Sequence, residues 1–546
     1  IWTAGGLMTA VLLSGSALVV GAGLTEVTDY PFSLGWSEGN RLWDYSLLFG
    51  TRLYSFDPGV PPVAYLDTGR QLVGGVPFLL PGVTILAARI WLALVATLSY
   101  LLLGLLAFWP RRVTSPQTWI LGALLVLVFL NQGPIHAPLV ISAILVVLGT
   151  RASILWGALL MIGAGYFAAT SRFTWMFAPA IWAVMIELGA IGPGRDDQPN
   201  HGRRRAIVLG LSGLLGSALA YSGVVVWSGA GVESSAVVST SQQLLWYRLL
   251  PNATYGQGIV LGLARAVVPL AVVLVYAAKH YWRPPRLQAV VLILALLAFL
   301  VVGLIVSAKI GGGGDLHNLD MFLIGMVFAA AVLWRASEQG WRQGRRILPW
   351  WTQLCLALAV TLPAYGPLLA LRPISFAEDA EWLRVLVDAE RARDLGSLPG
   401  TETVAASLDE IQRTVAEAQR VGPILFLDQR QLMTFGHVRN VQLVSEYEKK
   451  RLMDEALSGN RSYFDPFYRD LAAKRFALLV SSPLRTPIKD REYGFGEENN
   501  AWVEWVARPV LCYYEELDTL NEVKVQLLVP REDAVDCPSV LPRTRP

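Results

Sequence analysis

Apolar runs of membrane-spanning length recur through much of this chain, from residue 3 to residue 371. A helix that crosses the hydrocarbon core of a bilayer needs roughly 20 mostly apolar residues, and segments 3–24 and 85–109 both meet this requirement. Only 16% of the 546 residues are charged, against about 25% in soluble proteins. The chain is therefore a polytopic membrane protein, and the few ionisable residues near its spans become informative.

The apolar runs predict about eleven transmembrane helices that alternate in direction. The expected spans are 3–24, 85–109, 118–132, 134–149, 152–170, 174–191, 206–228, 257–278, 287–307, 320–335 and 350–371.

The positions of the basic residues orient these spans. With alternating helices, the same side of the membrane receives the basic connections around 111–112, 195–205, 279–286 and 335–346. Lys and Arg mark cytoplasmic loops, so we expect a multi-pass protein of the plasma membrane. The side outside the cytoplasm then receives residues 25–84, 229–256, 308–319 and the tail from residue 372.

The tail, residues 372–546, changes to the pattern of a small α/β domain that follows the transmembrane bundle, residues 1–371. The continuous apolar runs 422–428 and 475–482 are typical of buried parallel strands between helices, and 523–530 predicts a further strand. Because the tail has no glycine-rich phosphate loop, metal cluster or nucleophile elbow, we interpret it as a recognition or stabilising module.

Two cysteines, Cys512 and Cys537, lie in this tail. Disulfides persist outside the cytoplasm, so the expected topology favours a disulfide between them. The alternative is two unrelated buried thiols.

The first external loop, 25–84, is much longer than the roughly 4–6 residues typical of connections, and long ordered loops are usually functional. Its acidic residues include Asp29, Glu38 and Asp44. Partial desolvation of Glu38 beside Trp36 would raise its pKa and suit it to act as a base. Alternatively, Glu38 is simply a carboxylate at a helix N-terminus with Ser37 as the cap.

The segment 39–54 within this loop predicts an amphipathic helix, either in the outer membrane interface or packed on the protein.

A second polar cluster occupies residues 309–322. We expect Lys309 and His317 to hold an anion, and the glycines to let the backbone approach a ligand closely. The alternative is a flexible hairpin between two spans. The residues expected to contact substrate in this loop are Gly311, Gly312, Gly313, Gly314, Asp315, Asn318 and Asp320.

Three arginines near spans complete the candidate cations. Arg172 ends a span beside aromatic residues, where interfacial anchoring is the alternative interpretation. Arg89 and Arg265 lie within or near spans, and charges in a membrane indicate function by default. Cations for a phosphate, together with a carboxylate that activates a hydroxyl, suit transfer from a lipid-linked phosphate donor.

These residues resemble bacterial members of the GT-C superfamily of integral-membrane glycosyltransferases, in the branch of protein O-mannosyltransferases and the lipid A aminoarabinose transferase. The family places an acid, often in an Asp-Glu pair, soon after the first span. The matching stretch is GWSEGNRLWDY, in which Ser37 precedes Glu38, so the resemblance leaves Glu38, Asp29 or Asp44 as the base. The loop KIGGGGDLHNLD also looks like loops of bacterial members.

The resemblance implies inverting transfer of a hexosyl or pentosyl group from a polyprenyl-phosphate donor to a protein, glycan or lipid acceptor. Members with monophosphate donors often need no metal, whereas oligosaccharide-transferring relatives use a divalent cation. Mg²⁺ or Mn²⁺ would find hard oxygen ligands in Asp29, Glu38 and Asp315. Expected partners are membrane lipid and subunits of a membrane complex, with no nucleic acid.

Two other functions remain open from the sequence. One is a catalytically silent subunit that keeps the GT-C body as a scaffold. The other is a transporter or flippase for a lipid-linked sugar, which predicts inverted repeats; we see no such symmetry in the sequence.

Overall fold

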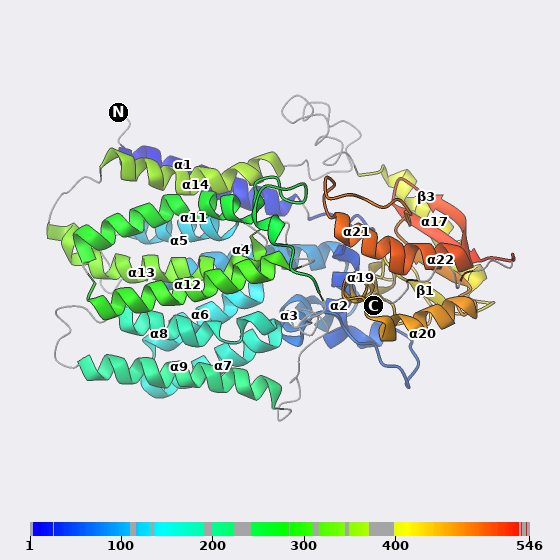
Figure 1. Ribbon diagram of the computed structural model, residues 1–546, viewed down its shortest axis with the longest axis horizontal. Coiled ribbons are helices and arrows are strands. Elements are labelled where there is room, and N and C mark those ends of the chain that lie inside the picture. The colour runs from blue at the N-terminus through cyan, green and yellow to red at the C-terminus, as the bar shows by residue number, and fades with distance from the viewer. Residues whose placement is uncertain are drawn as a thin grey trace. The chain divides into compact units, whose positions relative to one another are not determined.

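The computed structural model shows a mostly helical protein with one four-stranded sheet (Figure 1). It describes residues 4–25, 27–109, 116–132, 136–189, 199–222, 242–282, 284–309, 316–343, 349–370, 398–533, 537 and 542. The chain forms two compact units. The first, here called the helical unit, contains the described residues of Ile1–Leu24, Ala93–Ala230 and Leu244–Leu371. The second, the α/β unit, contains those of Thr25–Leu92, Gly231–Gln243 and Arg372–Pro546.

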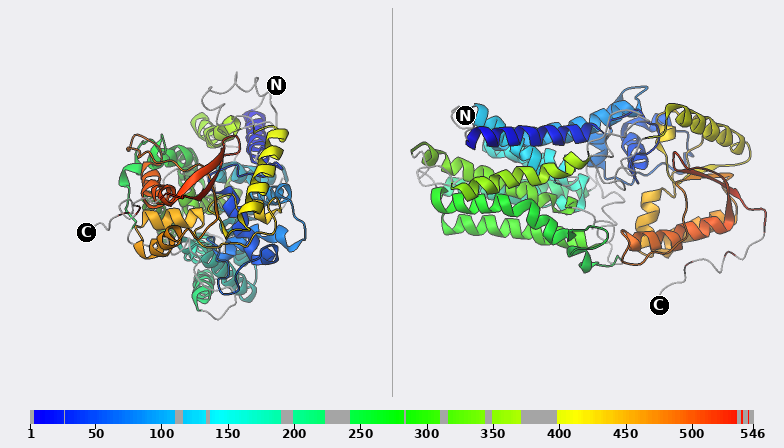
Figure 2. Two further views of the ribbon diagram at one scale, coloured as in Figure 1. Left: turned by 90° about the vertical axis from the view of Figure 1, so that its right-hand side faces the viewer. Right: turned by 90° about the horizontal axis from the view of Figure 1, so that it is seen from above.

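The helical unit is a bundle of apolar helices that run side by side (Figures 1 and 2). Its long helices are α1 (Ala4–Leu24), α4 (Ile85–Ala107, which begins in the α/β unit), α5 (Pro116–Leu130), α6 (Ala137–Arg151), α7 (Ile154–Ser171), α8 (Ala178–Gly189), α9 (Pro199–Tyr221), α11 (Gly258–Ala277), α12 (Arg286–Ala308), α13 (Asp320–Gln343) and α14 (Trp350–Ala370). Short helical turns connect them at η3 (Phe173–Trp175), η4 (Trp246–Leu249), η5 (Ala278–Trp282) and η6 (His317–Leu319).

Seven helices in the described part of the chain are long and apolar enough to cross a membrane. This finding is consistent with a membrane protein. Three of the other predicted spans appear as shorter apolar helices, Trp119–Leu130, Ala137–Arg151 and Phe173–Gly189. Helix α9 is long but begins with a polar, basic segment. The prediction of about eleven spans and their orientation therefore stays a prediction.

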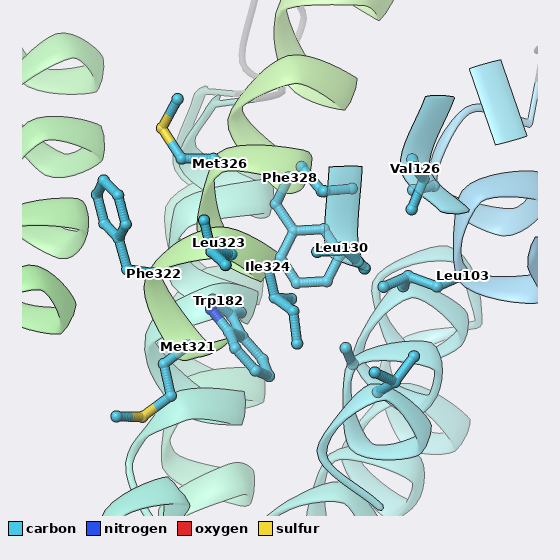
Figure 3. Close-up of a cluster of buried hydrophobic side chains, with 14 of the residues drawn as sticks. Leu103, Val126, Leu130, Trp182, Met321, Phe322, Leu323, Ile324, Met326 and Phe328 are labelled. Carbon is cyan, nitrogen blue, oxygen red and sulfur yellow. The ribbon is translucent and has the colours of Figure 1, made fainter. Parts of the chain in front are cut away.

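The core of the helical unit is built by helices that are far apart in the sequence (Figure 3). The indole of Trp182 in α8 lies with its ring centre 5.8 Å from Phe299 of α12 and 5.6 Å from Phe328 of α13. Around it pack Leu323 and Ile324, which are fully buried. Burial of large apolar side chains on these helices fixes the bundle's interior.

Glycines bring α7 and α9 into close contact. A Cβ atom on Gly216 would lie 2.0 Å from the backbone oxygen of Ile162, and one on Gly165 would lie 2.0 Å from that of Gly213. Small residues at such contacts let helix backbones approach closely in a membrane. By contrast, a Cβ on Gly163 would meet no atom within 4 Å.

The sheet of the α/β unit has the strand order β1-β2-β4-β3. Strand β1 (Ile424–Phe426) pairs in parallel with β2 (Leu478–Ser481), with Leu425 opposite Leu479. This confirms the parallel pair that the two apolar runs predicted. Strand β4 (Val525–Pro530) lies antiparallel to β2 and to β3 (Tyr514–Leu520), and β3 was not predicted from the sequence.

Helices cover this sheet and form the rest of the α/β unit. They are α2 (Glu38–Gly50), α3 (Thr68–Gly74), α17 (Thr401–Ala418), α18 (Gln431–Thr434), α19 (Lys449–Leu457), α20 (Arg461–Ala472), α21 (Gly496–Trp502) and α22 (Arg508–Tyr513), with shorter turns η1 (Thr51–Leu53), η2 (Val76–Leu79) and η7 (Val503–Ala507).

The first loop, which the sequence predicts as part of the membrane domain, clusters with the tail in the α/β unit. Helix α2 buries Trp43 completely, and the guanidinium of Arg430 lies 4.4 Å from the centre of that ring. The amide of Asn40 donates 2.6 Å to the Glu448 carboxylate. These contacts favour the packed alternative for the amphipathic segment 39–54.

Cys512 and Cys537 form the disulfide that the sequence analysis favoured, with Cα atoms 5.7 Å apart. The bond closes a sequence separation of 25 residues between the end of α22 and the C-terminal segment.

Candidate functional site

Glu38, the first residue of α2, pairs with Arg89 of α4. The guanidinium donates from Nε to Oε1 at 2.9 Å and from Nη2 to Oε2 at 3.1 Å. Oε2 also accepts from the backbone N–H of Leu34 at 2.6 Å. Ser37 occupies the cap position, but its side chain does not cap the helix. The carboxylate predicted as a base and a cation predicted for phosphate therefore bind each other.

Arg89 is also saturated by backbone acceptors. Its remaining donors reach the carbonyl oxygens of Thr28, Tyr30 and Phe32 at 2.8, 2.6 and 3.1 Å. All five N–H donors of an arginine are thus used. The pair anchors the start of the first loop to the start of α4.

Asp44 lies inside the α/β unit with 2% of its surface exposed. Its Oδ1 accepts from the backbone N–H of Tyr65 at 2.8 Å. Burial, and secondly the negative charge of Glu448, raise the pKa of Asp44 well above its usual range, because desolvation penalises the ionised form. Asp44 is therefore better interpreted as a structural residue in the interior of the α/β unit.

Asp29 differs from both, because it is exposed and lines a cavity of about 800 Å³ in the α/β unit. It follows shortly after Leu24, the last residue of α1, and the facing wall includes Thr84, Ile85 and Leu86 at the start of α4. The cavity is thus lined by a residue that follows one candidate span in the chain and by residues that begin another. Its volume falls within the roughly 300–1,000 Å³ of small-molecule sites.

The lining of this cavity also includes the segment 433–441, which begins at the end of α18. It contributes the apolar side chains of Met433 and Phe435 and the polar side chains of His437 and Arg439. Burial and the neighbouring charge of Arg439 lower the pKa of His437, so this imidazole is neutral near neutral pH. The exposed Arg439 uses its Nε to hold the carbonyl of Gly436 at 2.9 Å. The cavity therefore offers an acid, a cation and an apolar surface.

A second polar cluster lies in the helical unit, at the junction of η3 with η6 and α13. Nη2 of Arg172 donates to Oδ1 of Asn318 at 2.9 Å, and Nη1 lies 3.9 Å from Oδ2 of Asp320. Nε1 of Trp175 donates to the same Asp320 oxygen at 3.1 Å. Arg172 is only 6% exposed, and its buried Nε has no hydrogen-bond partner among the described residues. An unsatisfied buried donor of this kind suits an anionic ligand.

Two histidines border this cluster. The ring of His136, just before α6, lies 5.7 Å from that of Trp175 and 6.3 Å from that of His317. The structure thus brings together Arg172 and His317, which were predicted to bind the donor phosphate, with Asn318 and Asp320, which were predicted to contact substrate.

The other predicted cations have separate surroundings. Lys309 is half-buried and follows α12, where it forms an isolated backbone bridge with Leu244. The guanidinium of Arg265 in α11 lies 5.7 Å from the ring centre of Tyr365 in α14. Of the predicted glycine loop, Gly311, Gly312, Gly313, Gly314 and Asp315 lie outside the described residues.

The residues proposed for a divalent cation do not fit one. In the described part of the chain there is no group of three or more His, Cys, Asp or Glu side chains placed to hold a metal ion. Glu38 is occupied by Arg89, and Asp315 is outside the described residues.

Sequence reasoning missed several residues of these sites. His437 and Arg439 lie in a tail that was interpreted only as a recognition or stabilising module, and His136 lies between two short apolar runs. The only sequence signal was a charged or imidazole side chain next to apolar residues.

Comparisons with known proteins find no family model that matches the chain and no matching curated protein.

Proposed function

We propose that the protein is an integral-membrane glycosyltransferase that moves a sugar from a polyprenyl-phosphate donor to an acceptor hydroxyl, and that Asp29 is its base. The observation that carries this proposal is the exposed carboxylate of Asp29 on a cavity bounded by the first residues of α4. Because these residues begin a candidate span, a substrate with a lipid anchor can reach the cavity without leaving the bilayer. Glu38 and Asp44 suit the role less, because the first is held by Arg89 and the second is buried.

The reaction is a direct displacement at the anomeric carbon. The acceptor oxygen forms a bond to this carbon, the bond from the carbon to the phosphate oxygen breaks, and the hydroxyl proton passes to the carboxylate of Asp29. Polyprenyl phosphate leaves as the anion, and the configuration of the sugar inverts. A positioned base contributes about 10²- to 10⁴-fold to such a step.

The donor phosphate needs cations near the level of the lipid head groups. Within the helical unit, the cluster of Arg172 is a candidate anion site, because the guanidinium is buried and its Nε has no hydrogen-bond partner among the described residues. Asn318 and Asp320 hold its other end in place. Charge-assisted hydrogen bonds to a phosphate are roughly twice as strong as neutral ones.

A catalytically silent subunit is the second candidate. The Glu38–Arg89 pair favours it, because a carboxylate at the position that resembles the family's acid is used for structure. Under this alternative the cavity would bind a ligand without turning it over.

The test is sugar transfer by the purified chain in lipid nanodiscs, with a panel of radiolabelled polyprenyl-phosphate hexoses and pentoses and a membrane extract as acceptor. We expect Asp29→Asn to lower turnover at least about 100-fold. Asp57→Asn is the matched control, because Asp57 is an exposed acid of the same loop that does not line the cavity.

We expect Arg172→Gln to weaken donor binding about tenfold, the effect of one charge-assisted hydrogen bond. Its control is Arg204→Gln, at an exposed arginine in α9. A folded protein that transfers no sugar from any donor would refute the enzyme and leave the silent subunit.

A further inference from the structure

The cavity of Asp29 has an apolar lip. Leu79 and Leu80 are 57% and 68% exposed at the end of η2, and Leu53 is 39% exposed at the end of η1. Leu53 and Leu80 also line the cavity. The lip is fixed rather than loose, because Nη2 of Arg52 donates to the carbonyl oxygens of Phe78 and Leu80 at 2.7 and 3.4 Å.

This lip continues into the apolar stripe of a candidate span. Helix α4 starts directly after the lip and exposes leucine or isoleucine side chains at every fourth position. Residues four apart lie on one face of a helix, so the stripe is a single surface of the kind that faces lipid. The exposed residues of the stripe are Leu86, Ile90, Leu94, Leu98 and Leu102. Leu86 belongs both to the stripe and to the cavity wall.

Part of the cavity lining is polar and basic. Arg439 is exposed there, and His437 and Asn440 are its neighbours in the wall. A lining that combines exposed leucines with a cation matches an amphipathic molecule whose chains stay in the bilayer and whose head group carries negative charge.

We propose that the cavity binds an anionic membrane lipid, which enters from the bilayer past Leu79 and Leu80 and presents a head-group hydroxyl to Asp29. The inference rests on the proposed function, because it names the acceptor of that reaction as a lipid rather than a secreted protein. Arg439 holds the charged head group, and the lip holds the chains.

The test is photolabelling of the full chain, reconstituted in phosphatidylcholine vesicles that contain a trace of phosphatidylglycerol with a diazirine near its head group. No sugar donor is present, so the readout does not depend on transfer. We expect labelled peptides from 80–86 and 433–441. Arg439→Ala should lower this labelling about tenfold, the effect of one charge-assisted hydrogen bond. Arg485→Ala is the control, at an exposed arginine that does not line the cavity.

A second variant tests the entrance. Leu80→Ser should reduce labelling of 433–441, whereas Leu517→Ser, at an exposed leucine of β3 that does not line the cavity, should not. Thermal unfolding of each variant checks that the fold is kept.

Three results would overturn the inference. Label confined to the α4 stripe would mean that only surrounding lipid is seen. Equal labelling by a diazirine phosphatidylcholine, or no effect of Arg439→Ala, would show that the cavity does not select an anionic head group. Displacement of the probe by equimolar polyprenyl phosphate would assign the cavity to the donor.

The inference and the proposed function can fail separately. Labelling that depends on Arg439 without any sugar transfer would support the lipid site and refute the enzyme. Transfer to a soluble acceptor without labelling would refute the lipid site alone.

Discussion

Substitution of Glu38 and of Asp29 should have opposite effects on stability and on turnover. Glu38→Gln removes the charge that faces Arg89, whose side chain is 4% exposed, while that of Glu38 is 23% exposed. Breaking a buried ion pair by removing one partner costs about 3–5 kcal/mol. Because the Glu38 side chain is partly in water, we expect about 2–3 kcal/mol.

The same variant should keep its chemistry. A loss of this size should lower the melting temperature by about 2–5 °C, while turnover per folded molecule stays within a fewfold of the parent. Asp29→Asn should do the reverse, since exposed substitutions change stability by about 0.5 kcal/mol or less but loss of a base costs about 100-fold or more in rate.

The assay is thermal unfolding in detergent beside single-turnover sugar transfer, with both variants and the parent measured at equal folded concentration. Arg89→Met should match the stability loss of Glu38→Gln, because it breaks the same pair from the other side. A Glu38→Gln protein that melts like the parent but has lost turnover would show that Glu38 is the base. Full activity in Asp29→Asn would independently refute our assignment.

Three further changes test the structure. Asp44→Asn removes a group whose pKa is raised in the folded state, and an acid of this kind stabilises the fold less as the pH rises above about 4, the usual pKa of Asp. The parent should therefore lose stability relative to the variant between about pH 4 and the folded pKa of Asp44. Parallel pH profiles of the two proteins in urea unfolding would contradict this. Gly216→Ala places a methyl group 2.0 Å from a backbone oxygen and should lower the free energy of unfolding by about 1–3 kcal/mol. Gly163→Ala, at a position in open space, should be neutral or stabilising. Equal melting temperatures of the two variants would argue against close packing of α7 and α9. Replacing Cys512 and Cys537 by serine should cost about 3 kcal/mol in the chain-entropy model, and mass mapping that finds both thiols free in the parent would remove the disulfide.

The helices and the strands β1 and β2 could be predicted because their signal is local. A continuous apolar run such as 424–426 or 478–481 reports burial on both faces of a sheet, and the structure pairs these two runs in parallel. Strand β3 gave no such signal, because it carries Glu515, Glu516 and Asp518 and so has no continuous apolar run. Charged residues are a usual feature of exposed edges, and they hide a strand from a search for apolar runs.

The candidate sites could be predicted only in part, because their partners are distant in sequence. Glu38 and Arg89 are 51 positions apart, and Arg172 and Asn318 are 146 apart. Residue type and position in a loop were enough to mark these residues as unusual. They could not show that Glu38 is neutralised by Arg89, or that Arg172 and Asn318 belong to one cluster.

Burial of a charge is therefore a poor guide to function in this protein, and unused hydrogen-bonding capacity is a better one. Lys449 is buried, but its ammonium donates to Asp428 at 2.6 Å and to the Trp36 carbonyl and the Ser482 hydroxyl at 3.1 Å each, which uses all three of its donors. Such groups stabilise the fold and leave nothing for a ligand.

The remaining cations divide by the same criterion. The guanidinium of Arg205 donates to Glu187 and to three backbone carbonyls. It therefore connects helices α6, α8 and α9, and we do not expect it to bind a ligand. Arg172 keeps a buried Nε without a described partner, and Arg439 is exposed on a cavity. Because a bound anion needs donors that the protein itself has not satisfied, Arg172 and Arg439 are the residues at which phosphate-bearing substrates should be sought first.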